Sequence, residues 1–505
     1  MRESILLTLG VALGALLTIL AFPPFGLDVL IFLAPVPWLL VALRAGPRIG
    51  FVYGYLGSLA VYLIGLRWMS VVSWPGLIVS SVILSFYGGL LFSIIGWIAR
   101  RTKWPVAWVA PFVWVVLDGF RSFVLTGFAW LYLGHALSGR LAWIQIADLF
   151  GAYGVTFVVV LFGATGVDLV LKNRRLRVCL VTGCVALFVL AYGVVQLKST
   201  APIEGPRIAL VQANIAQELK VAGTQPEEIL ARHIYWTRQA LRENPDLVVW
   251  PETMFPGFYG YSCVETVQTQ EMVRSAGIPF LIGSNAASLR ETDATYQVAN
   301  SAFFLDAEGE VLGRCDKIHL VPFGEYVPGK SVFPRLEEIV LETAHFVPEI
   351  SSGKEQVLFE LKGIRFGVPI CFEVVHPWIS RSFVGRGADF LINLTNEGWF
   401  RGSTEYEQLE QVAVFRAVEN RVPVVRSGNS GITEIIESTG RIRIENRLEV
   451  DGQSVDVEGV LVRSIRLDPR RSLYTRLGDA FVFLCGFVVL GLLWRAHRSS
   501  PEKSG

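Results

Sequence analysis

Charge and cysteine are both scarce in this sequence, and each scarcity excludes a class of site. Charged residues make up only 18% of the 505 residues and leave a formal net charge of +1. Proteins that bind nucleic acids usually present a basic face, so we expect no nucleic-acid partner. The six cysteines show no C-x-x-C or comparable ligand spacing, so we expect no metal site, and no other motif asks for a cofactor.

The cysteines fall into two groups. Three lie in apolar runs, where we expect them to be packing residues: Cys179, Cys184 and Cys485. The other three lie in the middle of the chain: Cys263, Cys315 and Cys371. The sequence leaves open whether Cys263 and Cys315 form a disulfide.

Long apolar runs are what the sequence has in abundance. Hydrophobic residues reach 52%, and the mean hydropathy of +0.47 exceeds soluble norms. A helix that spans a bilayer needs ~20 apolar residues. We therefore expect about eight spans, at residues 5–22, 28–43, 50–66, 75–99, 105–125, 151–171, 178–197 and 479–494. No small-x-small cleavage site follows the first run, which we interpret as a helix and not a signal peptide.

Basic residues between these runs predict how the chain is oriented. They gather in alternate loops: Arg44 and Arg48, then Arg100, Arg101 and Lys103, then Lys172, Arg174, Arg175 and Arg177. Such loops face the cytoplasm, so we expect both termini there. Residues 1–198 then form a membrane domain of seven helices, residues 199–472 a catalytic domain on the opposite face, and residues 473–505 the last helix and a cytoplasmic tail.

The middle of the chain has shorter apolar runs that are separated by charges, glycine and proline. Strand-like segments such as RIALVQAN, DLVVW, PFLIGSN and DFLINLTN alternate with helical patterns near residues 226–243, 373–385 and 405–420. This alternation predicts an α/β domain with a substantial core.

Cys371 is the first candidate for chemistry in this domain. It follows the apolar run Ile364–Ile370 and precedes a predicted helix. A helix N-terminus would lower the pKa of the thiol and offer N–H groups to an oxyanion. The alternative is a buried structural cysteine, because free cysteines are among the most buried residues.

Charged residues follow two other strand ends. Glu252 comes after the strand Leu247–Trp250, where Pro251 ends the pairing, and a carboxylate there can act as a general base. Lys317 follows a hairpin strand and would stabilise a thiolate or an oxyanion. Glu325 lies between apolar and conformationally restricted residues, an unusual setting for a solvated carboxylate. Taken singly, Glu252 is more typical of a helix cap and Lys317 of a solvated surface.

Together, in this order, these residues resemble the carbon–nitrogen hydrolase (nitrilase) superfamily over about residues 205–460. The matching motifs are Trp250-Pro251-Glu252, Asp316-Lys317, Ile370-Cys371-Phe372-Glu373 and Asn396-Glu397-Gly398-Trp399-Phe400. The resemblance implies a nitrilase-like α-β-β-α sandwich with a Glu-Lys-Cys triad, beside the α-helical membrane domain.

Nearly the whole chain, spans included, is similar to the apolipoprotein N-acyltransferase family. The strings that agree are Phe22-Pro23-Pro24-Phe25, Thr126-Gly127-Phe128-Ala129-Trp130, the run from Lys317 to Glu325, and the run from Tyr474 to Asp479. The family implies that a membrane phospholipid gives its acyl chain to a cysteine. The N-terminal amine of a diacylglyceryl-cysteine on a lipoprotein then takes that chain. It also implies a bacterial inner-membrane enzyme with its catalytic domain on the periplasmic side, and we expect a monomer.

The resemblance assigns roles to particular residues. Cys371 is the nucleophile, Glu252 the general acid and base, and Lys317 an oxyanion partner. Three residues support the transition state: Glu325, which positions Lys317, Phe372, whose N–H faces the oxyanion, and Glu373, which supports the turn. Trp399 and Phe400 are expected to bind substrate.

The match departs from the family at five positions, of which two are mild: Phe372 stands where the family often has tyrosine, and Ser430 replaces an asparagine. Val221 stands near where the family has a tryptophan, Arg401 replaces a glycine, and Leu409 stands where a histidine is usual. None of these positions belongs to the triad. We also expect two loops rich in aromatic and aliphatic residues, 255–261 and 331–346, to dip toward the bilayer, with packing against the core as the alternative.

Two other functions remain open on the sequence alone. A membrane-tethered amidase or hydrolase would use the same triad but pass the acyl group to water. A transporter or receptor would need ionisable groups in its spans, where Asp118, Arg121 and Asp168 are the few candidates. Asp118 and Arg121 are three residues apart, so we expect them to pair on one helix face.

Overall fold

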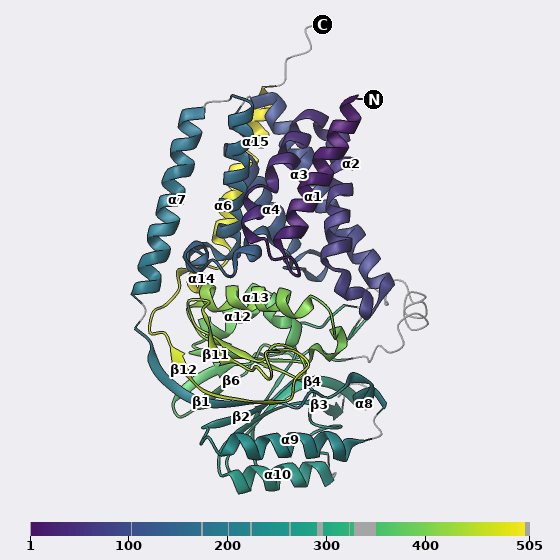
Figure 1. Cartoon of the computed structure of the whole chain (residues 1–505), viewed down its shortest axis with the longest axis vertical. Coiled ribbons are helices and arrows are strands. Elements are labelled where there is room, and N and C mark those ends of the chain that lie inside the picture. Colours follow the sequence, from purple (N-terminus) through teal and green to yellow (C-terminus); the bar gives the residue numbers. More distant parts are fainter. Residues whose placement is uncertain are drawn as a thin grey trace. The chain divides into compact units, whose positions relative to one another are not determined.

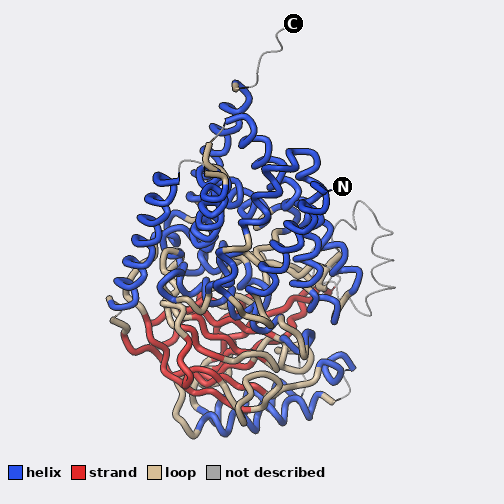
Figure 2. Tube along the Cα trace, turned by 45° about the horizontal axis from the view of Figure 1, so that its top comes forward, coloured by secondary structure: helices blue, strands red, loops and turns tan. Residues whose placement is uncertain are grey.

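The computed structural model describes residues 2–102, 104–172, 175–199, 201–222, 225–261, 264–289, 296–322, 324–327 and 350–499. The chain divides into two compact units. One contains Met1–Ser199 together with Ser472–Gly505, and the other contains Thr200–Arg471. Each unit has its own architecture, helical in the first and α/β in the second (Figures 1 and 2).

The first unit is built from helices. They are α1 (Arg2–Ala21), α2 (Pro35–Gly65), α3 (Trp74–Thr102), α4 (Ala110–Arg121), α5 (Leu141–Ile144), α6 (Ala147–Val170), α7 (Arg175–Lys198), α14 (Leu473–Leu477) and α15 (Ala480–Arg498). Large apolar side chains are exposed on their outer faces, for example Leu187, which is 70% exposed, and Phe487, which is 72% exposed. Six helical segments in the described part of the chain are long and apolar enough to cross a bilayer, which confirms the predicted helical membrane domain.

The segment Pro35–Gly65 covers most of two predicted spans, 28–43 and 50–66. Gly46 has a φ of +72° and interrupts the helix directly before Pro47. A methyl group on Gly57 would lie 3.8 Å from the indole of Trp38. In one continuous helix these two positions would be about 28 Å apart. The chain therefore reverses direction at Gly46, and α2 is a helical hairpin.

The span predicted at residues 105–125 is wrong in its length. The α-helix here, α4, covers only Ala110–Arg121 and is too short to cross a bilayer alone. Polar contacts hold the chain on both sides of this helix. The Asp168 carboxylate accepts hydrogen bonds from the N–H groups of Val106 and Ala107. Arg121 pairs with Asp118 at 3.0 Å and donates to the Trp130 carbonyl, which confirms the expected pair.

The second unit contains two six-stranded sheets in the described residues. The first has the order β12-β1-β2-β3-β4-β5 and the second β11-β10-β9-β8-β7-β6. The strands are β1 (Ile203–Gln212), β2 (Leu247–Trp250), β3 (Phe280–Leu289), β4 (Tyr296–Leu305), β5 (Val311–Asp316), β6 (Leu358–Leu361), β7 (Ile364–Gly367), β8 (Phe390–Thr395), β9 (Val424–Gly428), β10 (Glu434–Ile436), β11 (Ile442–Arg447) and β12 (Gly459–Leu467).

Helices cover the outer faces of both sheets (Figure 1). Helices α9 (Pro226–Leu241) and α10 (Val264–Ala276) lie on the first sheet, and α12 (Pro377–Gly385) and α13 (Glu405–Asn420) on the second. A short helix, α8 (Gln217–Ala222), follows β1. This is the expected α-β-β-α sandwich, and the fold class is confirmed.

Parallel pairing at the centre of each sheet positions the candidate residues. Strands β1, β2 and β3 are parallel to one another, as are β7, β8 and β9. The side chains of β2 and β8 are buried on both faces, as the near-continuous apolar runs in these two strands predict. The loops after parallel strands leave the sheet at one edge, where open α/β sheets usually bind their ligands.

Candidate active site

Cys371 lies in a tight turn after the second sheet's strand β7. It begins a one-turn 3₁₀ helix (Cys371–Val375) and has a φ of +52°. Few residues other than glycine adopt this conformation, and it is concentrated at functional sites. The predicted α-helix directly after the cysteine is wrong in its start, because α12 begins only at Pro377. The thiol therefore lacks the long helix dipole that the sequence suggested.

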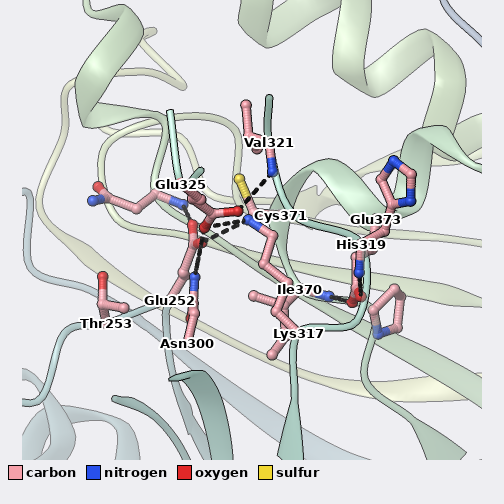
Figure 3. A network of polar contacts seen from close by, with 12 residues as sticks. Glu252, Thr253, Asn300, Lys317, His319, Val321, Glu325, Ile370, Cys371 and Glu373 are labelled. Carbon is pink, nitrogen blue, oxygen red and sulfur yellow. Dashed lines mark hydrogen bonds and ion pairs between the residues drawn. The ribbon is translucent and has the colours of Figure 1, made fainter. Parts of the chain in front are cut away.

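The carboxylate of Glu373 holds this turn in place. Its Oε2 accepts a 2.7 Å hydrogen bond from the Ile370 N–H. Its Oε1 accepts from the N–H groups of Ile318 and His319, at 2.7 and 3.0 Å. Glu373 thus ties the cysteine turn to the segment that follows Lys317 (Figure 3). Asn393 on β8 adds hydrogen bonds to the carbonyls of Pro369 and Cys371.

Glu252 is fixed at the end of β2 by two amides. Its Oε1 accepts a 2.7 Å hydrogen bond from Asn300 Nδ2, and its Oε2 accepts a 2.8 Å bond from the Asn396 N–H. Only 6% of the residue is exposed. A carboxylate held this way has few rotamers left and presents one face to the site.

Lys317 lies between two carboxylates. Its Nζ is 2.8 Å from Glu325 Oε1 and 3.6 Å from Glu252 Oε1. Burial alone would lower the pKa of Lys317, but the charges of Glu325, Cys371 and Glu252 together raise the pKa above its ordinary value. The ammonium therefore keeps its proton throughout the physiological range. Glu325 is itself held by the Val321 N–H, which donates to its Oε2 at 2.8 Å.

The Cys371 thiol points toward these charged groups (Figure 3). Burial raises its pKa well above the ordinary value, and the Glu252 charge raises the pKa further, whereas Lys317 lowers it. The sequence predicted a lowered pKa, and that expectation is wrong because burial outweighs the positive charges. A protonated thiol beside a fixed carboxylate is the arrangement that general-base activation requires.

The other expected site residues lie around this cluster. Phe372 follows the thiol in the turn, with its ring 5.1 Å from that of His376. Trp399 and Phe400 belong to a short 3₁₀ helix (Glu397–Phe400), with Trp399 41% exposed and Phe400 half-buried. This helix comes directly after Asn396, whose N–H holds Glu252.

Sequence reasoning missed Asn300, Asn396 as a hydrogen-bond donor, and Lys220. Asn300 is a buried amide on β4 that also lies 3.4 Å from Glu325 Oε1, so it bridges both carboxylates. The sequence did carry one hint of this role, because Asn300 is a polar residue among small ones at the centre of the strand-like run VANSA. Lys220 gave no signal, because its contacts are made by tertiary structure.

The departures from the family pattern have separate outcomes. Arg401 bonds to Asp456 Oδ1 at 2.8 Å and to Asn214 Oδ1 at 2.6 Å. These bonds join the Trp399 segment to the loop before β12 and to the loop after β1. Leu409 packs in the core on α13. The side chain of Val221 lies outside the described residues.

The two aromatic loops and the cysteine pair also have separate outcomes. In the loop 255–261, Phe255 and Tyr259 are buried in the core, whereas Phe258 and Tyr261 are exposed. Two of the four aromatic side chains in this loop therefore pack against the core, which was the alternative to contact with the bilayer. The loop 331–346 and Cys263 lie outside the described residues.

The comparisons with known proteins agree across both units. A family model for the apolipoprotein N-acyltransferase N-terminal domain matches residues 14–165, and one for carbon-nitrogen hydrolase matches residues 207–468. The chain is 34% identical to the apolipoprotein N-acyltransferase of Geobacter metallireducens, over 94% of this chain and 92% of that one. It is 28% identical to that of Bradyrhizobium diazoefficiens, over 97% of this chain and 95% of the other.

Among solved structures, the chain is similar to an amidase from Nesterenkonia sp.. The two are 18% identical, with a TM-score of 0.40, over 57% of this chain and 98% of that one.

Proposed function

The chain belongs to the apolipoprotein N-acyltransferase family, and we propose that it carries a fatty acyl chain from a membrane phospholipid to a lipoprotein through a thioester on Cys371. The acceptor is the N-terminal amine of the lipoprotein's diacylglyceryl-cysteine. The proposed chemistry uses side chains and one backbone N–H of the protein.

In the first half-reaction, Glu252 takes the thiol proton as the sulfur attacks the ester carbonyl of the phospholipid. The oxyanion that forms is stabilised by the Lys317 ammonium and the Phe372 N–H. The C–O bond then breaks, and the departing lysophospholipid alkoxide takes the proton from Glu252. The products are a Cys371 thioester and a lysophospholipid.

In the second half-reaction, the neutral amine of the acceptor attacks the thioester carbonyl. Glu252 takes a proton from the nitrogen, the C–S bond breaks, and the thiolate recovers that proton. The product is an amide, and the enzyme returns to its starting state. Dividing the transfer into two steps replaces one slow reaction by two easier ones.

One observation carries these roles: a half-buried thiol with a raised pKa lies beside a carboxylate and an ammonium that are both fixed by hydrogen bonds. The thiol needs a base, and Glu252 has the orientation to be one. Lys317 keeps its charge and therefore serves as an electrostatic partner and not as the base.

We propose that this reaction takes place at the periplasmic face of a bacterial inner membrane. Basic residues in alternate loops, and Arg495 and Arg498 at the end of α15, support cytoplasmic termini. Both substrates are anchored by acyl chains, and moving a chain into water costs ~0.8 kcal/mol for each CH₂. An enzyme held in the same membrane avoids that cost.

We propose that a single chain is the functional unit.

The test uses the purified full-length chain in detergent micelles with a phospholipid donor and a synthetic diacylglyceryl-cysteine peptide. Mass spectrometry of the peptide reads the product. We expect an N-acylated peptide with the wild type and none with Cys371→Ala or Cys371→Ser, whereas Glu360→Gln, at an exposed position of β6, behaves as the wild type. Free fatty acid with an unmodified peptide would identify a membrane-tethered hydrolase instead. N-acylated peptide from either Cys371 variant would show that another residue is the nucleophile.

A further inference from the structure

A second lysine reaches the turn that carries Glu252. Lys220 lies on α8, and its Nζ donates a 2.6 Å hydrogen bond to Thr253 Oγ1. Thr253 follows Glu252 directly and has a φ of +50°. Positive φ is rare for any residue with a side chain and a genuine outlier for a β-branched one. The hydrogen bond from Lys220 therefore holds a strained turn at the proposed general base.

The helix that carries Lys220 is tied to the other side of Glu252 as well. Gln217, one turn earlier on α8, accepts a 3.0 Å hydrogen bond from Asn396 Nδ2. The Asn396 backbone N–H in turn donates to Glu252 Oε2 at 2.8 Å. One short helix thus contacts both segments that orient this carboxylate, through Thr253 on one side and Asn396 on the other.

The charge of Lys220 is coupled first to that of Glu252 and then to that of the proposed nucleophile. The pKa of Lys220 is lowered to about 8 by burial, against the charges of Glu252 and Cys371, which raise it. Among the described residues, His233 on α9 also faces Lys220; burial lowers the pKa of His233 to about 4, so this imidazole is neutral near pH 7. Lys220 is therefore a cation at neutral pH that loses its charge on mild alkalinisation.

We propose that Lys220 is a further positioning residue of this active site. Its ammonium fixes the Glu252 turn through Thr253, and its positive charge, with that of Lys317, favours the thiolate of Cys371 and the oxyanion that forms next to it. This role deepens the proposed function, since it concerns the same thiol. It does not depend on which acyl donor or acceptor the enzyme uses.

The test measures the reactivity of the Cys371 thiol without any lipid. The full-length protein in detergent is treated with iodoacetamide, and mass spectrometry follows alkylation of the peptide that contains Cys371. We expect Lys220→Gln to slow this alkylation on the order of tenfold at pH 7.5, because one nearby positive charge is lost. Lys220→Arg keeps the charge and a donor and should restore most of the rate. Lys354→Gln, an exposed lysine of the same unit, is the matched control.

The pH profile separates a charge effect from a merely structural one. In the wild type, Lys220 loses its proton above about pH 8, so its help to the thiolate fades there. An arginine stays charged. The ratio of the Lys220→Arg rate to the wild-type rate should therefore rise as the pH increases past 8. Thr253→Val, which keeps the β-branched shape but removes the acceptor, tests the hydrogen bond separately and should also slow alkylation.

Two results would overturn the role of Lys220. One is an alkylation rate for Lys220→Gln equal to that of the wild type. The other is equal slowing by Gln and Arg, with a constant ratio across the pH range. If Lys220→Gln does not fold, Thr253→Val decides the question, and an unchanged rate there contradicts the proposal. Normal iodoacetamide reactivity without acyl transfer in the wild type would contradict the proposed function and leave the role of Lys220 standing.

Discussion

The ammonium of Lys317 lies 2.8 Å from Glu325 Oε1, and only 1% of the lysine side chain is exposed. A buried ion pair of this kind keeps both charges in one geometry. It follows that Lys317 acts as a permanent positive charge, and that proton transfer falls to Glu252, whose Oε1 is 3.6 Å away from the same nitrogen.

Replacing Glu325 by Gln removes the nearer partner of this buried ammonium. Breaking a buried pair typically costs about 3–5 kcal/mol, and we expect the lower part of that range because Glu252 remains nearby. The thermal midpoint of the purified protein should fall, together with acyl transfer. Glu360→Gln, on the exposed side of β6, is the control and should change neither. An unchanged midpoint for Glu325→Gln would show that the pair adds nothing to stability.

Glu373→Gln tests the support of the cysteine turn. Glu373 accepts three backbone N–H bonds with two oxygens, whereas glutamine offers one oxygen and turns an NH₂ group toward a donor. A buried donor left without a partner costs about 1–3 kcal/mol. We expect slower thioester formation with a folded protein, measured by single-turnover release of lysophospholipid. If the rate matches the wild type, the turn does not depend on this carboxylate.

Two neighbouring histidines, the half-buried His319 and the buried His376, predict a loss of stability in acid. Burial lowers the pKa of His319 to about 4 and that of His376 well below its ordinary value of 6.5. As the pH falls from 6.5 toward 4, the unfolded chain binds protons that the folded state excludes, so the free energy of unfolding decreases. Each such group contributes up to about 1.4 kcal/mol for each pH unit in that window.

His376→Phe and His376→Gln both remove one of these groups. We expect the thermal midpoint of either variant to fall less steeply than that of the wild type between pH 6.5 and 4. If the apolar and the polar replacement give the same pH dependence, the effect comes from the titration of His376 and not from its packing. Parallel slopes for all three proteins would mean that His376 is charged in the folded state.

Much of this architecture is readable from local sequence because it depends on local patterns. The apolar runs identify the helical unit, and the segment DLVVW, closed by Pro251, places Glu252 at a strand end. The carboxyl ends of parallel strands meet at one edge, so a carboxylate, an ammonium and a thiol far apart in the chain could be expected together. The direction in which each of these side chains points could not be predicted from the sequence.

The features that sequence reasoning missed all depend on tertiary contacts. The raised pKa of Cys371 results from burial, which no local pattern reports. The bridging role of Asn300 needs β4 to lie beside Glu252 and Glu325 at once. The short helix α4 ends at Arg121, whose side chain bonds to the carbonyl of Trp130. This contact lies outside any periodic pattern, so the sequence did not show where the helix ends.

The most direct test of the account is the mass of the enzyme after exposure to a phospholipid without an acceptor. We expect one acyl chain on the peptide that contains Cys371, released by hydroxylamine at neutral pH as a thioester is, and transferred when the diacylglyceryl peptide is added. An acyl group on a different residue, or steady transfer to the peptide while Cys371 stays unmodified at every time point, would contradict it.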